Sequence, residues 1–308
     1  MPSISEDRGF WPPPGRKEEK VKKRIAWIVL SCVMFLSSIA LILYYLWGNG
    51  YLWKAKTAPP PQTYPEFTYP TIDESDYNAL IAGVTQSVET KETNPGDPSE
   101  PSETTKPLVD VPCPVDFDAL SLVNPEIIGW IYMNKPEISL PILRSHTDDS
   151  WYLYHDAVGN YKREGSLFVE HEFNAPDFTD PVTIIYGHRM SSGSMFGTLQ
   201  ATLSEDGYFD ENRYIVIFTQ KETKIYQIFA TLPSDSQHIL YYNDFNAEGV
   251  FDAYIDALYQ STGMEVRLIP EARPSEGDRV VVLSSCLWGD RTKRYLVFAK
   301  EVQNIKAQ

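Results

Sequence analysis

The feature that most constrains this chain is a pair of predicted β-strands near its C-terminus, at residues 279–285 and 294–300. The first is a continuous apolar run, which is typical of a strand buried on both faces. Cys286 follows it directly, and the polar loop after Cys286 contains a Gly-Asp pair that favours a turn. Arg294 opens the second strand. The sequence therefore predicts a thiol at the end of a buried strand, with an arginine at the start of the neighbouring strand.

A second apolar strand, predicted at residues 182–187, ends next to a histidine. Gly187 permits a tight backbone turn just before His188, because glycine lacks a Cβ. A nearby imidazole or guanidinium lowers the pKa of a thiol and so favours the reactive thiolate. The other four histidines lie in predicted polar surface segments. We therefore predict Cys286 as a nucleophile, His188 as general acid and then base, and Arg294 as a donor to the oxyanion.

Three cysteines are too few for a disulfide framework, so Cys286 needs its own explanation. It could be a buried core residue, or it could pair with Cys113 in an oxidising compartment. Its position, last before a polar loop, favours a reactive thiol over both alternatives. Arg291 competes with Arg294 for the predicted role of oxyanion donor. It lies in the loop before the strand, so Arg294 is preferred.

The N-terminal region predicts a membrane anchor. Residues 25–47 contain no charged side chain, and the run is long enough for a helix that spans a bilayer. Residues 1–24 hold seven Lys/Arg against four Asp/Glu, which favours a cytoplasmic basic tail. The alternative, a cleaved signal peptide, has an apolar region of about 7–15 residues that ends in small residues. This run is longer and ends in aromatic residues, so we predict a single-pass membrane protein with an extracellular catalytic domain.

Residues 48–112 predict a disordered stalk. They are rich in Pro, Thr, Ser and Glu, with four basic and ten acidic side chains. Proline runs favour extended spacers, and such a composition buries too little apolar surface to fold. Dense hydrophobic periodicity begins near Cys113, so we predict one folded domain at residues 113–308.

The predicted domain is mainly β. After an amphipathic helix at about residues 115–125, short strands rich in Ile, Val, Tyr and Phe recur until residue 300. An apolar stripe at residues 247–262 predicts a helix inserted between two late strands. Many short strands with few helices favour a closed barrel, which we expect to have about eight strands.

Composition and spacing argue against several other functions. The domain carries sixteen Lys/Arg and twenty-eight Asp/Glu, a net charge of −12, which disfavours nucleic acid as a partner. Residues 170–172 read Glu-His-Glu, but no His-Glu-x-x-His motif follows them and no cysteine pair is available for zinc. We expect no metal and no cofactor.

Several motifs, taken in order, resemble those of the class B sortases over about residues 113–303. The strongest lie at residues 186–190, 193–197, 283–286 and 294–297. The inserted helix is also a trait of this class. The resemblance implies that the family's catalytic His, Cys and Arg fall on His188, Cys286 and Arg294. Ser285 stands where the family usually has threonine, and Ser285 and Tyr186 are candidates for lining the substrate site.

The resemblance implies a cysteine transpeptidase of a Gram-positive cell surface. Such enzymes cleave the C-terminal sorting motif of secreted proteins after threonine and hold the product as a thioester, here on Cys286. They then transfer it to an amine of a peptidoglycan precursor. Two alternatives stay open: a pilin-polymerising sortase that uses a protein lysine, and a non-catalytic surface binding module.

Overall fold

The structure is a computed structural model, and it describes residues 16–48, 69–92, 112–205, 207, 209 and 213–306. Residues 1–15 of the predicted tail, and residues 49–68 and 93–111 of the predicted stalk, lie outside the described residues. The chain divides into two compact units, Met1–Thr63 and Tyr64–Gln308.

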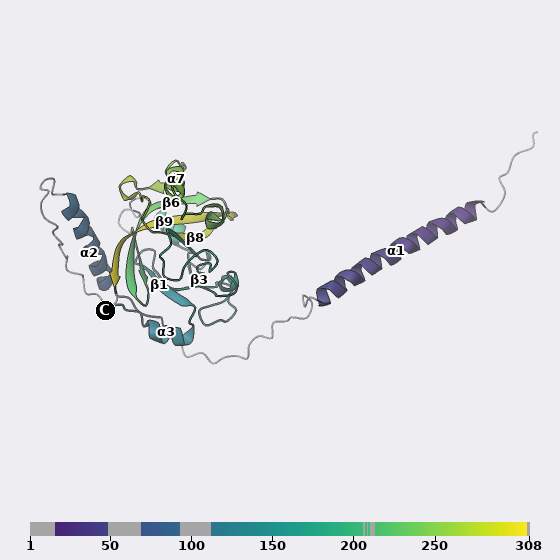
Figure 1. Cartoon of the computed structure of the whole chain (residues 1–308), viewed down its shortest axis with the longest axis horizontal. Helices are drawn as coiled ribbons and strands as arrows, with labels where there is room; N and C mark the ends of the chain where they lie inside the picture. The colour runs from purple at the N-terminus through teal and green to yellow at the C-terminus, as the bar shows by residue number, and fades with distance from the viewer. Residues whose placement is uncertain are drawn as a thin grey trace, which may run out of the picture. The chain divides into compact units, whose positions relative to one another are not determined.

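The first unit contains helix α1 (Arg16–Gly48), which includes the whole predicted membrane segment at residues 25–47 (Figure 1). Among the helices in the described part of the chain, none combines the length and the apolar character needed to cross a membrane. The membrane anchor stays a prediction.

The second unit is built around a closed barrel of eight strands (Figure 1). Neighbouring strands follow the order β5-β1-β2-β3-β4-β8-β9-β6, and pairing of β5 with β6 closes the ring. Strand β7 adds to β6. The strands are β1 (Ile127–Met133), β2 (Ile138–Leu143), β3 (Leu167–Phe168), β4 (Val182–Tyr186), β5 (Tyr214–Phe218), β6 (Glu222–Ser234), β7 (Arg267–Leu268), β8 (Val280–Leu287) and β9 (Asp290–Lys306). The predicted closed barrel of about eight strands is confirmed.

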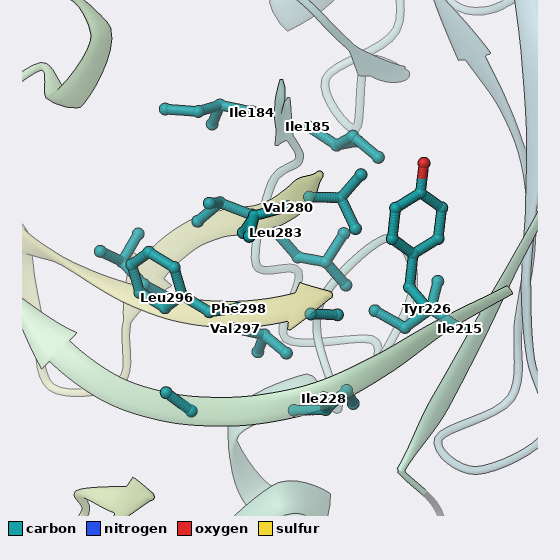
Figure 2. Close-up of a cluster of buried hydrophobic side chains, with 14 of the residues drawn as sticks. Ile184, Ile185, Ile215, Tyr226, Ile228, Val280, Leu283, Leu296, Val297 and Phe298 are labelled. Carbon is teal, nitrogen blue, oxygen red and sulfur yellow. The ribbon is translucent and has the colours of Figure 1, made fainter. Parts of the chain in front are cut away.

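Strands β8, β9 and β6 supply much of the hydrophobic core (Figure 2). Residues 280–283 of β8 are each at most 2% exposed, as expected for a strand covered on both faces. Phe298 of β9 and Ile228 of β6 belong to the same cluster. Because protein cores are close-packed, this cluster holds the end of β8, and with it Cys286, in one place.

The two predicted helices of the domain are present. Helix α3 (Phe117–Val123) begins after Asp116, whose carboxylate accepts a hydrogen bond from the Ala119 N–H at 2.9 Å. Helix α7 (Val250–Tyr259) lies between β6 and β7 in the chain and buries Phe251, Ile255 and Leu258. Shorter helical segments are η1 (Trp151–Leu153), α4 (Leu199–Leu203), α6 (Ile239–Tyr242) and η2 (Pro270–Ala272).

Helix α2 (Glu74–Glu92) lies within residues 48–112, the stretch predicted as a disordered stalk, and here the structure differs from the prediction (Figure 1). Tyr77, Leu80 and Val84 recur at helical spacing and are buried in a core cluster shared with β1 and β5. The Tyr77 hydroxyl donates to a β5 carbonyl, that of Tyr214, at 3.3 Å. The polar composition of the stretch as a whole hid a short amphipathic helix that belongs to the folded domain.

Replacing Leu80 with alanine is expected to lower the free energy of unfolding by about 2–5 kcal/mol, because it removes a buried side chain and leaves a cavity. Leu80 is 2% exposed, whereas Leu122 of α3 is 85% exposed. Leu122→Ala is therefore the matched control, with an expected change within about 0.5 kcal/mol. Urea unfolding measures both variants. Equal effects of the two substitutions would contradict the packing of α2 on the barrel.

Candidate active site

The strand register brings the three predicted catalytic residues together. In the parallel pair β4–β8, Tyr186 lies opposite Ser284. His188 and Cys286 each follow two residues later, so both emerge at the same edge of the barrel. In the antiparallel pair β8–β9, Cys286 lies opposite Arg294. All three side chains line one cavity of about 440 Å³.

A backbone contact extends the β4–β8 pairing toward the site. The Gly187 N–H donates to the Ser284 carbonyl at 3.1 Å, which holds the residue before His188 against β8. Gly187 is needed here for its lack of a side chain. A Cβ at this position would collide with Leu167 Cδ2 and lie 2.6 and 2.8 Å from two ring carbons of Phe196.

Replacing Gly187 with alanine is expected to destabilise the fold by about 1–3 kcal/mol, because overpacking forces neighbours out of their rotamers. Leu167 and Phe196 are 1% and 0% exposed, so neither has space into which to move. The same displacement should shift His188 and reduce peptide cleavage. Urea unfolding and cleavage assays check the two effects, and a variant as stable and active as the original chain would contradict this close contact.

A bulge in β9 positions the side chain of Arg294, which lines the cavity. Cys286 pairs with Arg294 while Leu287 pairs with Asp290, so residues 291–293 are left out of the ladder. Arg294 Nη1 donates to the carbonyls of Arg291 and Lys293 at 3.4 and 3.3 Å. The bulge thus supplies acceptors for the guanidinium. Arg291, the competing arginine, is exposed and is not among the residues that line the cavity.

His188 has a defined orientation. Its Nε2 lies 2.9 Å from the carbonyl oxygen of Leu153, which follows β2 in the chain and lines the same cavity. Because a carbonyl can only accept, Nε2 carries the proton in this contact. That leaves Nδ1 as the nitrogen able to exchange a proton with a reacting group.

Tyr186 and Ser285, the predicted lining residues, both border the cavity. Burial raises the pKa of the Tyr186 phenol above its ordinary value, the charge of Glu170 and a hydrogen bond with it raise this pKa further, and Arg294 lowers it. Tyr186 is therefore a neutral donor at physiological pH. Ser285 is 2% exposed, and its Oγ has no hydrogen-bond partner in the described part of the chain.

A Glu170–His238 pair that the sequence analysis missed also lines the cavity. His238 Nε2 lies 2.8 Å from Glu170 Oε2, and the Tyr241 N–H donates to His238 Nδ1 at 3.1 Å. An accepting Nδ1 with a donating Nε2 describes a neutral imidazole. The sequence offered little signal, because the two residues lie 68 positions apart. His238 was predicted in a polar surface segment, and Glu170 was considered only as part of a possible metal motif.

The remaining cysteines do not engage Cys286. Cys32, Cys113 and Cys286 are all free thiols, so the alternative Cys113–Cys286 disulfide does not form. Burial raises the pKa of the Cys113 thiol, which disfavours its thiolate. Cys286 is half-buried at the edge of the cavity. Within the described residues, no group of His, Cys, Asp and Glu side chains is arranged to hold a metal ion.

Several known proteins to which this chain is similar are sortases. The chain is 31% identical to Sortase B of Listeria monocytogenes over 169 residues, 54% of this chain and 65% of the relative. It is 26% identical to Sortase B of Staphylococcus aureus over 190 residues, 61% of this chain and 75% of the relative. The matched stretch thus spans slightly less than two thirds of the Listeria protein. No family model matches the chain.

Among solved structures, sortase B from Bacillus anthracis in complex with AAEK1 superposes with a TM-score of 0.53 at 27% identity. The superposition covers 62% of this chain and 84% of that chain. The closed eight-stranded barrel is therefore a sortase fold. The sequence relatives and the structural neighbours together support a class B sortase, the family that the sequence motifs resemble.

Proposed function

We propose that this chain is a cysteine transpeptidase that acts on a C-terminal sorting motif of secreted proteins. One observation carries the proposal: the thiol of Cys286, the imidazole of His188 and the guanidinium of Arg294 come from three neighbouring strands and line one cavity. Membership of the sortase family supports the same reaction class.

In the proposed first half-reaction, the Cys286 sulfur attacks the carbonyl carbon of the motif's threonine. Arg294 donates to the oxygen as negative charge develops on it. The carbon–nitrogen bond then breaks, and the leaving amine takes a proton from protonated His188 through Nδ1. The products are a thioester on Cys286 and the released C-terminal peptide.

In the proposed second half-reaction, an acceptor amine attacks the thioester carbonyl and gives its proton to His188. The carbon–sulfur bond breaks, which regenerates the Cys286 thiolate and joins the protein to the acceptor. An amine of a peptidoglycan precursor is the proposed acceptor. Water in place of the amine would make the same site a hydrolase.

A panel of quenched fluorescent peptides tests the reaction class. It carries Leu-Pro-x-Thr-Gly, Asn-Pro-x-Thr-Asn and Pro-Pro-x-Thr-Gly motifs, and mass spectrometry locates the cut. Cleavage after threonine, with transfer to an added amine, is the expected result. If no peptide is cleaved and Cys286 also resists iodoacetamide, the thiol is structural and the chain is a binding module.

We also propose that residues 25–47 anchor the protein in the cell membrane, with residues 1–24 in the cytoplasm and the barrel outside. Apolar side chains along α1 are exposed, including Trp27 at 70% and Phe35 at 68%, and basic residues precede them in the sequence. The full-length protein is expected in the membrane fraction after a carbonate wash, and a variant without residues 1–63 in the soluble fraction. Release of the full-length protein by the wash would refute the anchor.

A further inference from the structure

Trp288 connects the two segments that carry the thiol and the imidazole. It lies in the β8–β9 turn, two residues after Cys286. Its backbone N–H donates to Oε1 of Gln200 at 2.8 Å. The guanidinium carbon of Arg189, the residue after His188, lies 5.4 Å from the centre of the Trp288 ring. Two different contacts therefore join the segment that follows His188 to the turn that follows Cys286.

Gln200 is held in a single orientation. It lies on α4 and is 6% exposed. Its Nε2 donates to Oε2 of Glu265, in the segment before β7, at 3.0 Å. Because a backbone N–H can only donate and a carboxylate accepts, the two partners fix which end of the amide faces Trp288. Both polar atoms of a buried side chain are thus used to hold the turn.

The turn needs such support because regular strand pairing is interrupted beside Cys286. The β8–β9 register shifts between Cys286 and Leu287, and residues 291–293 bulge out of the ladder. Gly289 completes the turn with a φ of +85°, a conformation that other residues rarely adopt. Beyond Cys286 the ladder keeps only the Leu287–Asp290 pair, so contacts from outside the hairpin add support to the turn.

We propose that Gln200 is a positioning residue, which sets the geometry between Cys286 and His188 by holding the Trp288 backbone against α4 while Arg189 holds the Trp288 ring. This inference rests on the proposed function, in which Cys286 attacks the same substrate that His188 protonates. Gln200 and Trp288 are not among the residues that line the cavity, so peptide binding should be little affected. The relative position of the thiol and the imidazole should change, and the rate of the chemical step should fall.

A charge swap at the Gln200–Glu265 contact tests the inference in the full-length protein. Gln200→Glu places two carboxylates in contact. Their repulsion should displace the side chain at position 200 and weaken its hydrogen bond with the Trp288 N–H. Adding Glu265→Gln restores the pair with donor and acceptor exchanged, because the carboxylate introduced on α4 can then accept from both the Trp288 N–H and the amide introduced before β7. We expect Gln200→Glu to lower kcat for peptide cleavage about tenfold to hundredfold, the scale of a small misplacement of reacting groups. KM should stay nearly constant, and the double variant should recover most of kcat.

A readout without substrate separates this inference from the proposed function. The rate at which iodoacetamide alkylates Cys286 is measured against pH for the original chain and both variants. The pH at which the alkylation rate is half its maximum should shift in Gln200→Glu. It should return to the value of the original chain in the double variant. An unmoved profile, or a moved one that the double variant does not restore, overturns the inference. Absence of peptide cleavage by the original chain would count against the proposed function alone.

Arg189→Leu provides a second test if Gln200→Glu fails to fold. It removes the contact with the Trp288 ring from a partly exposed position, without a buried charge. We expect a smaller loss in kcat, about two- to fivefold, as suits a single cation–π contact. A kcat equal to that of the original chain, with an unmoved alkylation profile, would overturn the inference by this route.

Discussion

Replacing Cys286 with alanine is expected to reduce cleavage of a sorting-motif peptide by at least about a thousandfold, because the variant cannot form the thioester that covalent catalysis requires. Cys286 lies at the end of β8, half-buried at the edge of the cavity, where its loss removes no core packing. The fold should survive, and the thermal unfolding midpoint should change little. Quenched-peptide assays and thermal unfolding measure the two quantities.

Cys113→Ala is the matched control for this substitution. Cys113 is also a free and partly buried thiol, but its Sγ donates to the Val115 carbonyl at 3.6 Å, and it does not line the cavity. Cleavage by the Cys113 variant should equal that of the original chain. Turnover retained in Cys286→Ala, or lost equally in both variants, would contradict the assignment of Cys286 as nucleophile.

Replacing Arg294 with alanine is expected to lower kcat by about a hundredfold to a thousandfold, the cost of losing one donor to a developing oxyanion. Arg294 lies opposite Cys286 across the β8–β9 pair, and its guanidinium is held by two carbonyls of the bulge. Arg294→Lys should recover only part of the loss, because a lysine keeps the charge without the planar fork of donors. Steady-state kinetics on the peptide substrate measure these effects.

Arg291→Ala separates the role of Arg294 from that of charge near the site. Arg291 contributes its backbone carbonyl to the bulge, and alanine retains that carbonyl. Its side chain is exposed and does not line the cavity. Cleavage by this variant should be nearly unchanged. A loss as large as that of Arg294→Ala would show that the wrong arginine has been assigned.

The three central site residues could be predicted because each lies next to a strongly apolar strand in the sequence. In the sequence, Cys286 follows one apolar run and His188 another, while Arg294 opens a third. In the structure, Cys286 lies near the end of β8 and Arg294 lies within β9. Short apolar runs give both the strands and their ends, and parallel pairing then brings the ends to one edge. The barrel and the inserted helix α7 were predictable for the same local reason.

The parts that escaped prediction depend on contacts between distant segments. Glu170 and His238 are 68 residues apart, and Gln200 and Trp288 are 88 apart. No local pattern marks such a pair, because each residue taken alone resembles an ordinary surface group. Helix α2 was missed for another reason: its apolar residues form a short cluster within a long polar, proline-rich stretch, whose overall composition they change little.

The most direct test of the account is the intact mass of the protein during turnover. The full-length chain is mixed with an intact sorting-motif peptide that it cleaves in the fluorescence assay. The reaction is quenched in acid within the first turnover and analysed by mass spectrometry. The account predicts a mass increase equal to the N-terminal fragment of the peptide, located on Cys286 and removed by hydroxylamine as a thioester should be. Cleavage without any covalent adduct, or an adduct on a different residue, would contradict it.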